Sequence, residues 1–90
     1  MPDMNQEIRN RIKLSVYAYA YEYESTSLVS DEEYDSLSYQ IKPEVSTGNR
    51  KLDNFFKARF DPSTGMWIRQ HPELDKVKSI YERFYKGRNY

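Results

Sequence analysis

Apolar and aromatic residues recur at helical spacing over the first quarter of the chain. One stripe advances in steps of four, four, three and four, through Ile8, Ile12, Val16, Tyr19 and Tyr23. This is the period of one face of an α-helix, and the stretch contains neither Pro nor Gly. The pattern therefore predicts a helix from about Asn5 to Glu24. A second, adjacent line makes this helix apolar or aromatic on more than one side: Leu14, Tyr17 and Tyr21.

A second helix is predicted directly after a short break at 25–29. Ser30 followed by Glu33 matches a capping box, in which each side chain satisfies the free backbone N–H of the other residue. The acidic residues that follow Ser30 also suit the positive end of a helix dipole. We expect this helix to run from about Asp31 to Ile41, because Pro43 disfavours helical angles in the residue before it.

Beyond residue 42 the pattern predicts shorter elements. A loop at 46–49 precedes a short aromatic helix, which carries Leu52, Phe55, Phe56 and Phe60. Pro62 and Gly65 mark a turn. A last helix is expected over 71–86, with Pro72 in its first turn and Gly87 at its end. The predicted fold class is all-α: a single domain over 1–90, a small bundle of about four helices with an N-terminal helical hairpin at 5–41.

Composition and charge narrow the classes of function. The chain has 90 residues, with 14 Lys plus Arg against 14 Asp plus Glu, no Cys and a single His. A neutral chain has no general attraction to nucleic acid or acidic lipid. Thiolate metal sites and disulfides are excluded. No stretch resembles a secretory h-region or the roughly 20 apolar residues of a membrane span, so a cytoplasmic location is expected.

The best candidates for ligand-binding residues cluster around the predicted hairpin. Asp31, Tyr34 and Asp35 stand at i, i+3 and i+4, which places a carboxylate, a ring and a carboxylate on one helix face. Tyr21 lies a short turn away and is expected to face Tyr34 across a slot that suits a flat, cationic or amide-bearing ring. The alternative is structural: acids at a helix start usually cap it, and tyrosines at this spacing usually belong to a half-buried core.

The same segment resembles a known family. Residues 29–37 read Val-Ser-Asp-Glu-Glu-Tyr-Asp-Ser-Leu. This is similar to the Ile-x-Asp-x-Glu-Tyr-Asp-x-Leu run in the N-terminal segment, domain Ia, of bacterial NAD-dependent DNA ligases. The ten-residue step from Tyr21 to Asp31 matches that family's step, and the downstream His-Pro-Glu-Leu matches 71–74. The tract at 46–68 loosely resembles short stand-alone phage or prophage proteins that carry this segment.

The resemblance implies a ligand and a set of contacts. In the ligases the segment holds the nicotinamide mononucleotide half of NAD, so Tyr21 and Tyr34 would stack on it while Asp31 and Asp35 make polar contacts. Glu22 stands where the family has histidine, and it is the fifth residue that the resemblance assigns to the ligand site. The ligase nucleophile motif Lys-x-Asp-Gly is missing from the sequence. The expected protein is therefore not an enzyme and requires no cofactor; it is a module that binds nicotinamide mononucleotide or NAD weakly.

Two other functions stay open from the sequence. The first is a small interaction protein that engages a host or phage protein through an aromatic-rich surface with Phe55, Phe56 and Trp67. The second is weak single-strand binding by a basic cluster beside those rings, which consists of Arg50, Lys51, Lys57 and Arg59. His71 is expected to cap a helix or lie exposed rather than act as a base, since no nucleophile partner can be named.

Overall fold

The computed structural model describes residues 4–88 and contains no strand within them. The chain forms, in order, α1 (Met4–Glu24), α2 (Asp31–Ser38), α3 (Arg50–Ala58), the 3₁₀ helix η1 (Met66–Gln70) and α4 (Leu74–Phe84). The all-α prediction is confirmed. None of the described helices has the length and apolar character needed to cross a membrane.

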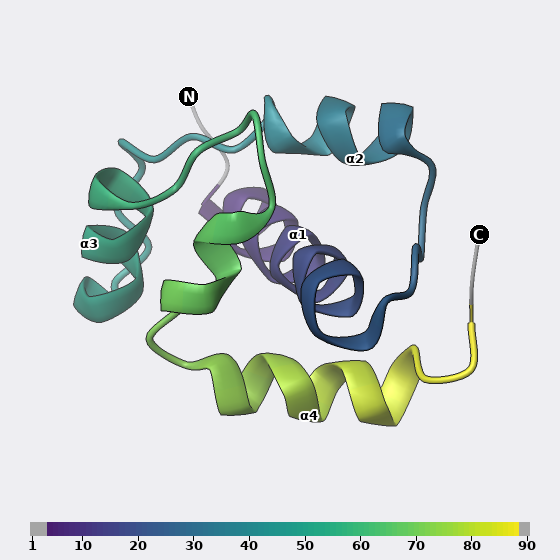
Figure 1. Cartoon of the computed structure of the whole chain (residues 1–90). Coiled ribbons are helices and arrows are strands. Elements are labelled where there is room, and N and C mark those ends of the chain that lie inside the picture. Colours follow the sequence, from purple (N-terminus) through teal and green to yellow (C-terminus); the bar gives the residue numbers. More distant parts are fainter. Residues whose placement is uncertain (1–3, 89–90) are drawn as a thin grey trace.

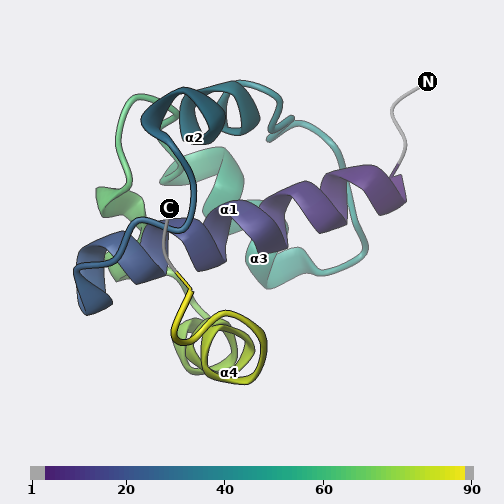
Figure 2. The ribbon, with the colours of Figure 1, turned by 90° about the vertical axis from the view of Figure 1, so that its right-hand side faces the viewer.

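The long helix α1 is the centre of the arrangement. Helices α2 and α4 lie across opposite sides of it, and η1 fills the space beside it (Figure 1). The view at right angles shows α1 along its length with α2 above and α4 below (Figure 2). Helix α3 stands apart, since none of its Cα atoms lies within 8 Å of a Cα atom in another described helix.

Local sequence explains where α2 begins and ends. The Ser30 side chain accepts a hydrogen bond from the Glu33 backbone N–H at 3.1 Å, as half of the predicted capping box. The helix ends at Ser38, three residues before the expected Ile41. Its last turn tightens, because the N–H groups of Gln40 and Ile41 bond to carbonyls three residues back. This turn directs Ile41 into the core, where 6% of it is exposed.

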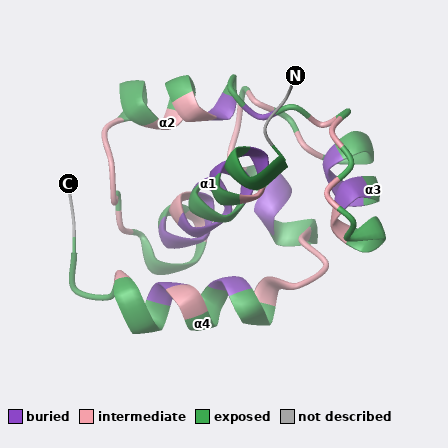
Figure 3. Ribbon diagram, turned by 180° about the vertical axis from the view of Figure 1, so that it is seen from behind, coloured by how far each residue is buried: buried purple, intermediate pink, exposed green. Residues whose placement is uncertain are grey.

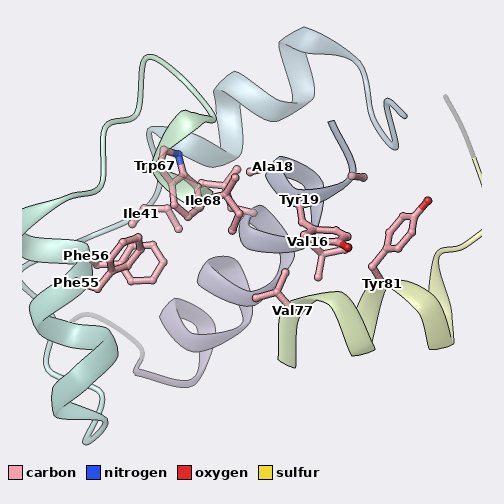
Figure 4. Close-up of a cluster of buried hydrophobic side chains, with 12 residues drawn as sticks. Val16, Ala18, Tyr19, Ile41, Phe55, Phe56, Trp67, Ile68, Val77 and Tyr81 are labelled. Carbon is pink, nitrogen blue, oxygen red and sulfur yellow. The ribbon is translucent and has the colours of Figure 1, made fainter. Parts of the chain in front are cut away.

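The hydrophobic core surrounds α1 on several sides (Figures 3 and 4). Its members come from α1, α3, η1 and α4, and from the end of the α2 turn: Leu14, Val16, Ala18, Tyr19, Ala20, Ile41, Phe55, Phe56, Trp67, Ile68, Val77 and Tyr81. Aromatic rings link α3 to η1, with Phe56 and Trp67 ring centroids 5.7 Å apart. The side chains of α3 therefore reach the core, although its backbone lies apart from the other helices.

Exposure in the structure departs from two patterns in the sequence. In the first stripe of α1, Ile12 is 44% exposed and Tyr23 is 41% exposed. Phe55, Phe56 and Trp67 are core residues, with at most 7% exposed, so they present no aromatic surface to a partner protein. They are equally unable to stack on bases of a single strand, and the basic residues of α3 form a solvated face.

In place of the apolar stripe, α1 buries an ionic network near its start. Arg11 is 5% exposed, and its Nε donates to Glu7 Oε2 at 2.7 Å while Nη1 donates to Asp53 Oδ1 at 2.8 Å. Its Nη2 donates to the backbone carbonyls of Lys42 and Val45. One guanidinium thus ties α1 to α3 and to the loop between α2 and α3.

The two acids of this network are themselves fully bonded. Glu7 accepts from the Lys42 backbone N–H through both carboxylate oxygens. Asp53 accepts from the backbone N–H and the hydroxyl of Thr47, at 2.9 and 2.6 Å. Burial acts to raise the pKa of Asp53, but these Thr47 bonds and the Arg11 guanidinium outweigh it, and the pKa lies below its ordinary value. The carboxylate is therefore charged at neutral pH.

We expect Arg11→Met to destabilise the fold severely, because it leaves two buried carboxylates without their cation. The expected loss is about 3–5 kcal/mol in the free energy of unfolding. The matched control is Arg69→Met, which removes a guanidinium whose side chain is 52% exposed and is expected to cost below about 1 kcal/mol. Urea denaturation followed by circular dichroism measures both. Equal effects of the two substitutions would contradict a structural role for the network.

Candidate functional site

Three of the five predicted site residues line one small pocket beside α1. Tyr21, Asp31 and Tyr34 surround a cavity of about 120 Å³. Its remaining walls come from α1, the α1–α2 loop and the turn before η1: Tyr17, Ala18, Ser27, Leu28, Val29 and Gly65. The lining is mostly apolar, and its residues with polar groups are Ser27, Asp31 and the tyrosines. This arrangement supports the predicted meeting of the α1 end with the α2 start.

Tyr34 forms a fixed wall of the pocket. Its ring is half-buried, and its hydroxyl donates to the Thr64 carbonyl at 3.3 Å. The same carbonyl accepts from the Trp67 indole N–H at 2.8 Å. Burial, opposed by the Trp67 side chain and assisted by the charges of Asp35 and Glu22, raises the pKa of Tyr34 to about 12. The phenol is therefore neutral, and its hydroxyl is fixed by the hydrogen bond to Thr64.

Tyr21 differs from Tyr34 in its freedom. It lies three residues before the end of α1, and 62% of it is exposed. Asp31 is also exposed, in the first turn of α2. The two residues stand at the solvent edge of the pocket, with the half-buried Tyr34 as their partner. A planar ligand entering here would meet one open ring and one fixed ring.

The other two predicted residues do not line this pocket. Glu22 accepts from Arg69 Nε at 3.2 Å, so its carboxylate is engaged with η1. Asp35 is exposed on α2, one residue beyond Tyr34 and therefore on another side of the helix. The polar contacts expected from Glu22 and Asp35 thus reduce to longer-range charge effects on Tyr34.

A wider hollow of about 460 Å³ adjoins the pocket at the start of α2. It is lined by Ser27, Val29, Ser30, Asp31 and Glu32, of which Ser27, Val29 and Asp31 also line the small pocket. Acidic side chains gather there, because Asp31, Glu32 and Glu33 occupy the first turn of α2. The field at this site favours a positively charged group over an anion.

Sequence reasoning missed the walls that come from elsewhere in the chain. Gly65 was expected in a turn, but nothing in the sequence indicates that this turn packs against Tyr34. A Cβ atom placed on Gly65 would lie 3.2 Å from the Tyr34 hydroxyl and 3.7 Å from the Ala18 Cβ. The absence of a side chain at Gly65 therefore gives the Tyr34 ring its room.

His71 lies outside this pocket and next to aromatic rings. Its ring centroid is 5.2 Å from that of Phe55, and its Nδ1 accepts from the Glu73 backbone N–H at 3.0 Å. Burial, opposed by the charge of Glu73, lowers the pKa of His71 to about 4. At neutral pH the imidazole is therefore uncharged, with its proton on Nε2. This bond orders the backbone before α4, but His71 does not cap the helix, which begins at Leu74 with Glu73 as its N-cap, three residues after the expected start.

Comparison of the chain with protein-family models, curated proteins and solved structures found no significant match. Within residues 4–88 there is no group of three or more His, Asp or Glu side chains placed to hold a metal ion.

Stability is expected to depend on pH through His71. Its pKa is about 4 in the folded chain and near 6.5 when unfolded, so the unfolded state binds the proton more tightly. This contribution is complete above about pH 6.5 and is lost as the pH falls towards 4. Urea denaturation between pH 7 and 4 should show a steeper decline in the parent chain than in His71→Asn, whose side-chain oxygen replaces the Nδ1 acceptor. Parallel curves would contradict the neutral, buried imidazole.

Proposed function

We propose that this protein is a non-catalytic binding module that takes up the cationic nicotinamide ring of nicotinamide mononucleotide or NAD in the small pocket. The observation that carries the proposal is the convergence of Tyr21, Asp31 and Tyr34 on one cavity. The ring would insert between the two phenols with the Asp31 carboxylate at its edge.

The size of the pocket defines which part of the ligand enters. A cavity of about 120 Å³ is well below the roughly 300–1,000 Å³ of pockets that enclose a whole small molecule. It has space on the order of one flat ring. The ribose and phosphate would remain in the adjoining hollow at the start of α2, exposed to water. Weak binding follows, because much of the ligand surface stays hydrated.

The charge of the site supports a cation over a neutral ring. A nicotinamide ring joined to ribose carries a positive charge, which aromatic faces and carboxylates both attract. Tyr21 supplies the exposed face, and Asp31 is the acidic residue among those that line the pocket. The phosphate gains less, because the acids in the first turn of α2 oppose the attraction of its backbone N–H groups.

An interaction with a protein partner remains the second candidate, with a changed surface. Within residues 4–88, the aromatic rings that a partner could reach include Tyr21, Tyr23, Tyr39 and Phe84, each more than 40% exposed. A partner that covers Tyr21 would compete with the nucleotide for the same pocket edge.

Titration by ¹H–¹⁵N NMR with two matched ligands tests the proposal. The cation 1-methylnicotinamide is expected to bind with a dissociation constant in the millimolar range, and about tenfold more tightly than neutral nicotinamide. Nicotinamide mononucleotide should shift the same amides, those of 27–31, Tyr34 and Gly65. Equal affinities of the two rings would contradict the charge argument, and no shifts at ~10 mM ligand would contradict the site.

Three variants separate the pocket from the rest of the surface. Tyr21→Ala removes the exposed ring and should weaken 1-methylnicotinamide about fivefold or more. Gly65→Ala crowds the Tyr34 hydroxyl and should also weaken binding of 1-methylnicotinamide. It introduces no backbone strain, since the φ angle of Gly65 is −103°. Tyr39→Ala is the matched control, because Tyr39 is 67% exposed and lies outside the pocket. An effect of Tyr39→Ala equal to that of Tyr21→Ala would count against the pocket.

A further inference from the structure

A larger cavity lies elsewhere on α1, between α1, α3 and α4. It measures about 340 Å³, and its walls are mainly aliphatic and aromatic. The apolar residues come from all three helices: Ile8, Ile12, Leu52, Phe56, Val77 and Ile80. None of the residues proposed to hold nicotinamide lines it. For scale, an engineered apolar cavity of about 150 Å³ is enough to bind benzene.

The cavity is a consequence of how α3 is held. The backbone of α3 keeps its distance from the other helices, and two fixed contacts set that distance. At one side the Arg11–Asp53 ion pair joins α1 to α3. Next to this ion pair, Phe56 packs against Trp67 and lies beneath the Arg11 guanidinium, whose Cζ is 4.9 Å from the ring centroid. Because both contacts are buried, α3 cannot move inward to close the space without breaking them.

The charges beside the cavity are already compensated within the protein. Arg11 is paired with Glu7 and Asp53, and Lys76 Nζ lies 3.1 Å from Glu73 Oε2. An anionic occupant would therefore have to compete with these acids for Arg11 and Lys76. The cavity favours a neutral molecule.

One residue of the lining carries a hydrogen-bond donor. His71 lines the cavity, and its Nδ1 accepts from the Glu73 backbone N–H, which leaves the proton on Nε2. Among the described residues no hydrogen bond from Nε2–H to a protein acceptor is found, and no buried side-chain nitrogen there lacks a partner, so Nε2 is open to solvent. A carbonyl oxygen is the natural complement of such a donor.

We propose that this cavity is a second binding site, for an uncharged small molecule of one or two rings that is mostly hydrocarbon and carries one hydrogen-bond acceptor. The apolar walls select the hydrocarbon body, the compensated charges select against anions, and His71 Nε2–H receives the acceptor. The site is independent of the nicotinamide pocket, so either can fail without the other.

Three probes of the same shape test this class: acetophenone, ethylbenzene and benzoate, titrated into the full chain by ¹H–¹⁵N NMR. Acetophenone is expected to shift amides along the cavity, at Ile12, Leu52 and Val77, rather than those at 27–34. Ethylbenzene, which lacks the acceptor, should bind about tenfold more weakly. Benzoate should bind more weakly than acetophenone. Tighter binding of benzoate, or no shifts with saturating acetophenone, would overturn the proposal.

Variants locate the binding. Ile12→Trp introduces bulk from a cavity wall that is 44% exposed and should abolish the shifts, whereas Lys13→Trp, on the next, exposed position, should leave them unchanged. His71→Asn should remove the preference for acetophenone over ethylbenzene. Shifts that persist in Ile12→Trp overturn the site. Cavity amides that shift with protein concentration alone would also overturn it, since a second copy of the chain would then be the occupant.

Discussion

The position of α3, and much that depends on it, is set by one buried guanidinium. Arg11 joins the start of α1 to Asp53 of α3 and to the carbonyls of Lys42 and Val45, while Glu7 fastens the Lys42 backbone. In a small all-α domain, neighbouring helices normally lie close together and are positioned by direct packing of their side chains. Here α3 is held at a distance by an ion pair and a few aromatic rings. Burying these charges is costly, so the cost is offset only while every bond is made.

The helices were predictable because their signals are local. Ser30 caps α2 as its spacing with Glu33 indicated, and Asn49 caps α3 by accepting from the Leu52 N–H. The burial of α1 was not predictable in the same way. A central helix is covered on several sides, so a single stripe does not describe it, and Glu7 with Arg11 looks like an ordinary exposed i,i+4 pair. Its third member, Asp53, is 42 residues from Arg11.

The small pocket divides in the same manner. Tyr21, Asp31 and Tyr34 are brought together by a helix end, a short loop and a helix start, which spacing alone can anticipate. The predicted contact from Asp35 is absent from the pocket, because one step along a helix from Tyr34 rotates the side chain to another face. The predicted contact from Glu22 is also absent from the pocket, because its carboxylate forms an ion pair with Arg69, a residue far along the chain. Gly65 and the Thr64 carbonyl, which fix Tyr34, follow from tertiary contacts that no local pattern records.

Two different halves of α1 serve the two cavities. Tyr17, Ala18 and Tyr21, late in the helix, line the small pocket, whereas Ile8, Ile12 and Ser15, early in the helix, line the larger cavity. The early half is the part that carries Arg11, so loosening the ionic network would disturb the larger cavity first. The small pocket depends instead on the Thr64 carbonyl, which fixes Tyr34, and on the α1–α2 loop. Trp67 takes part in both supports, through its ring against Phe56 and its indole N–H on the Thr64 carbonyl, so the two cavities share this residue as well as α1.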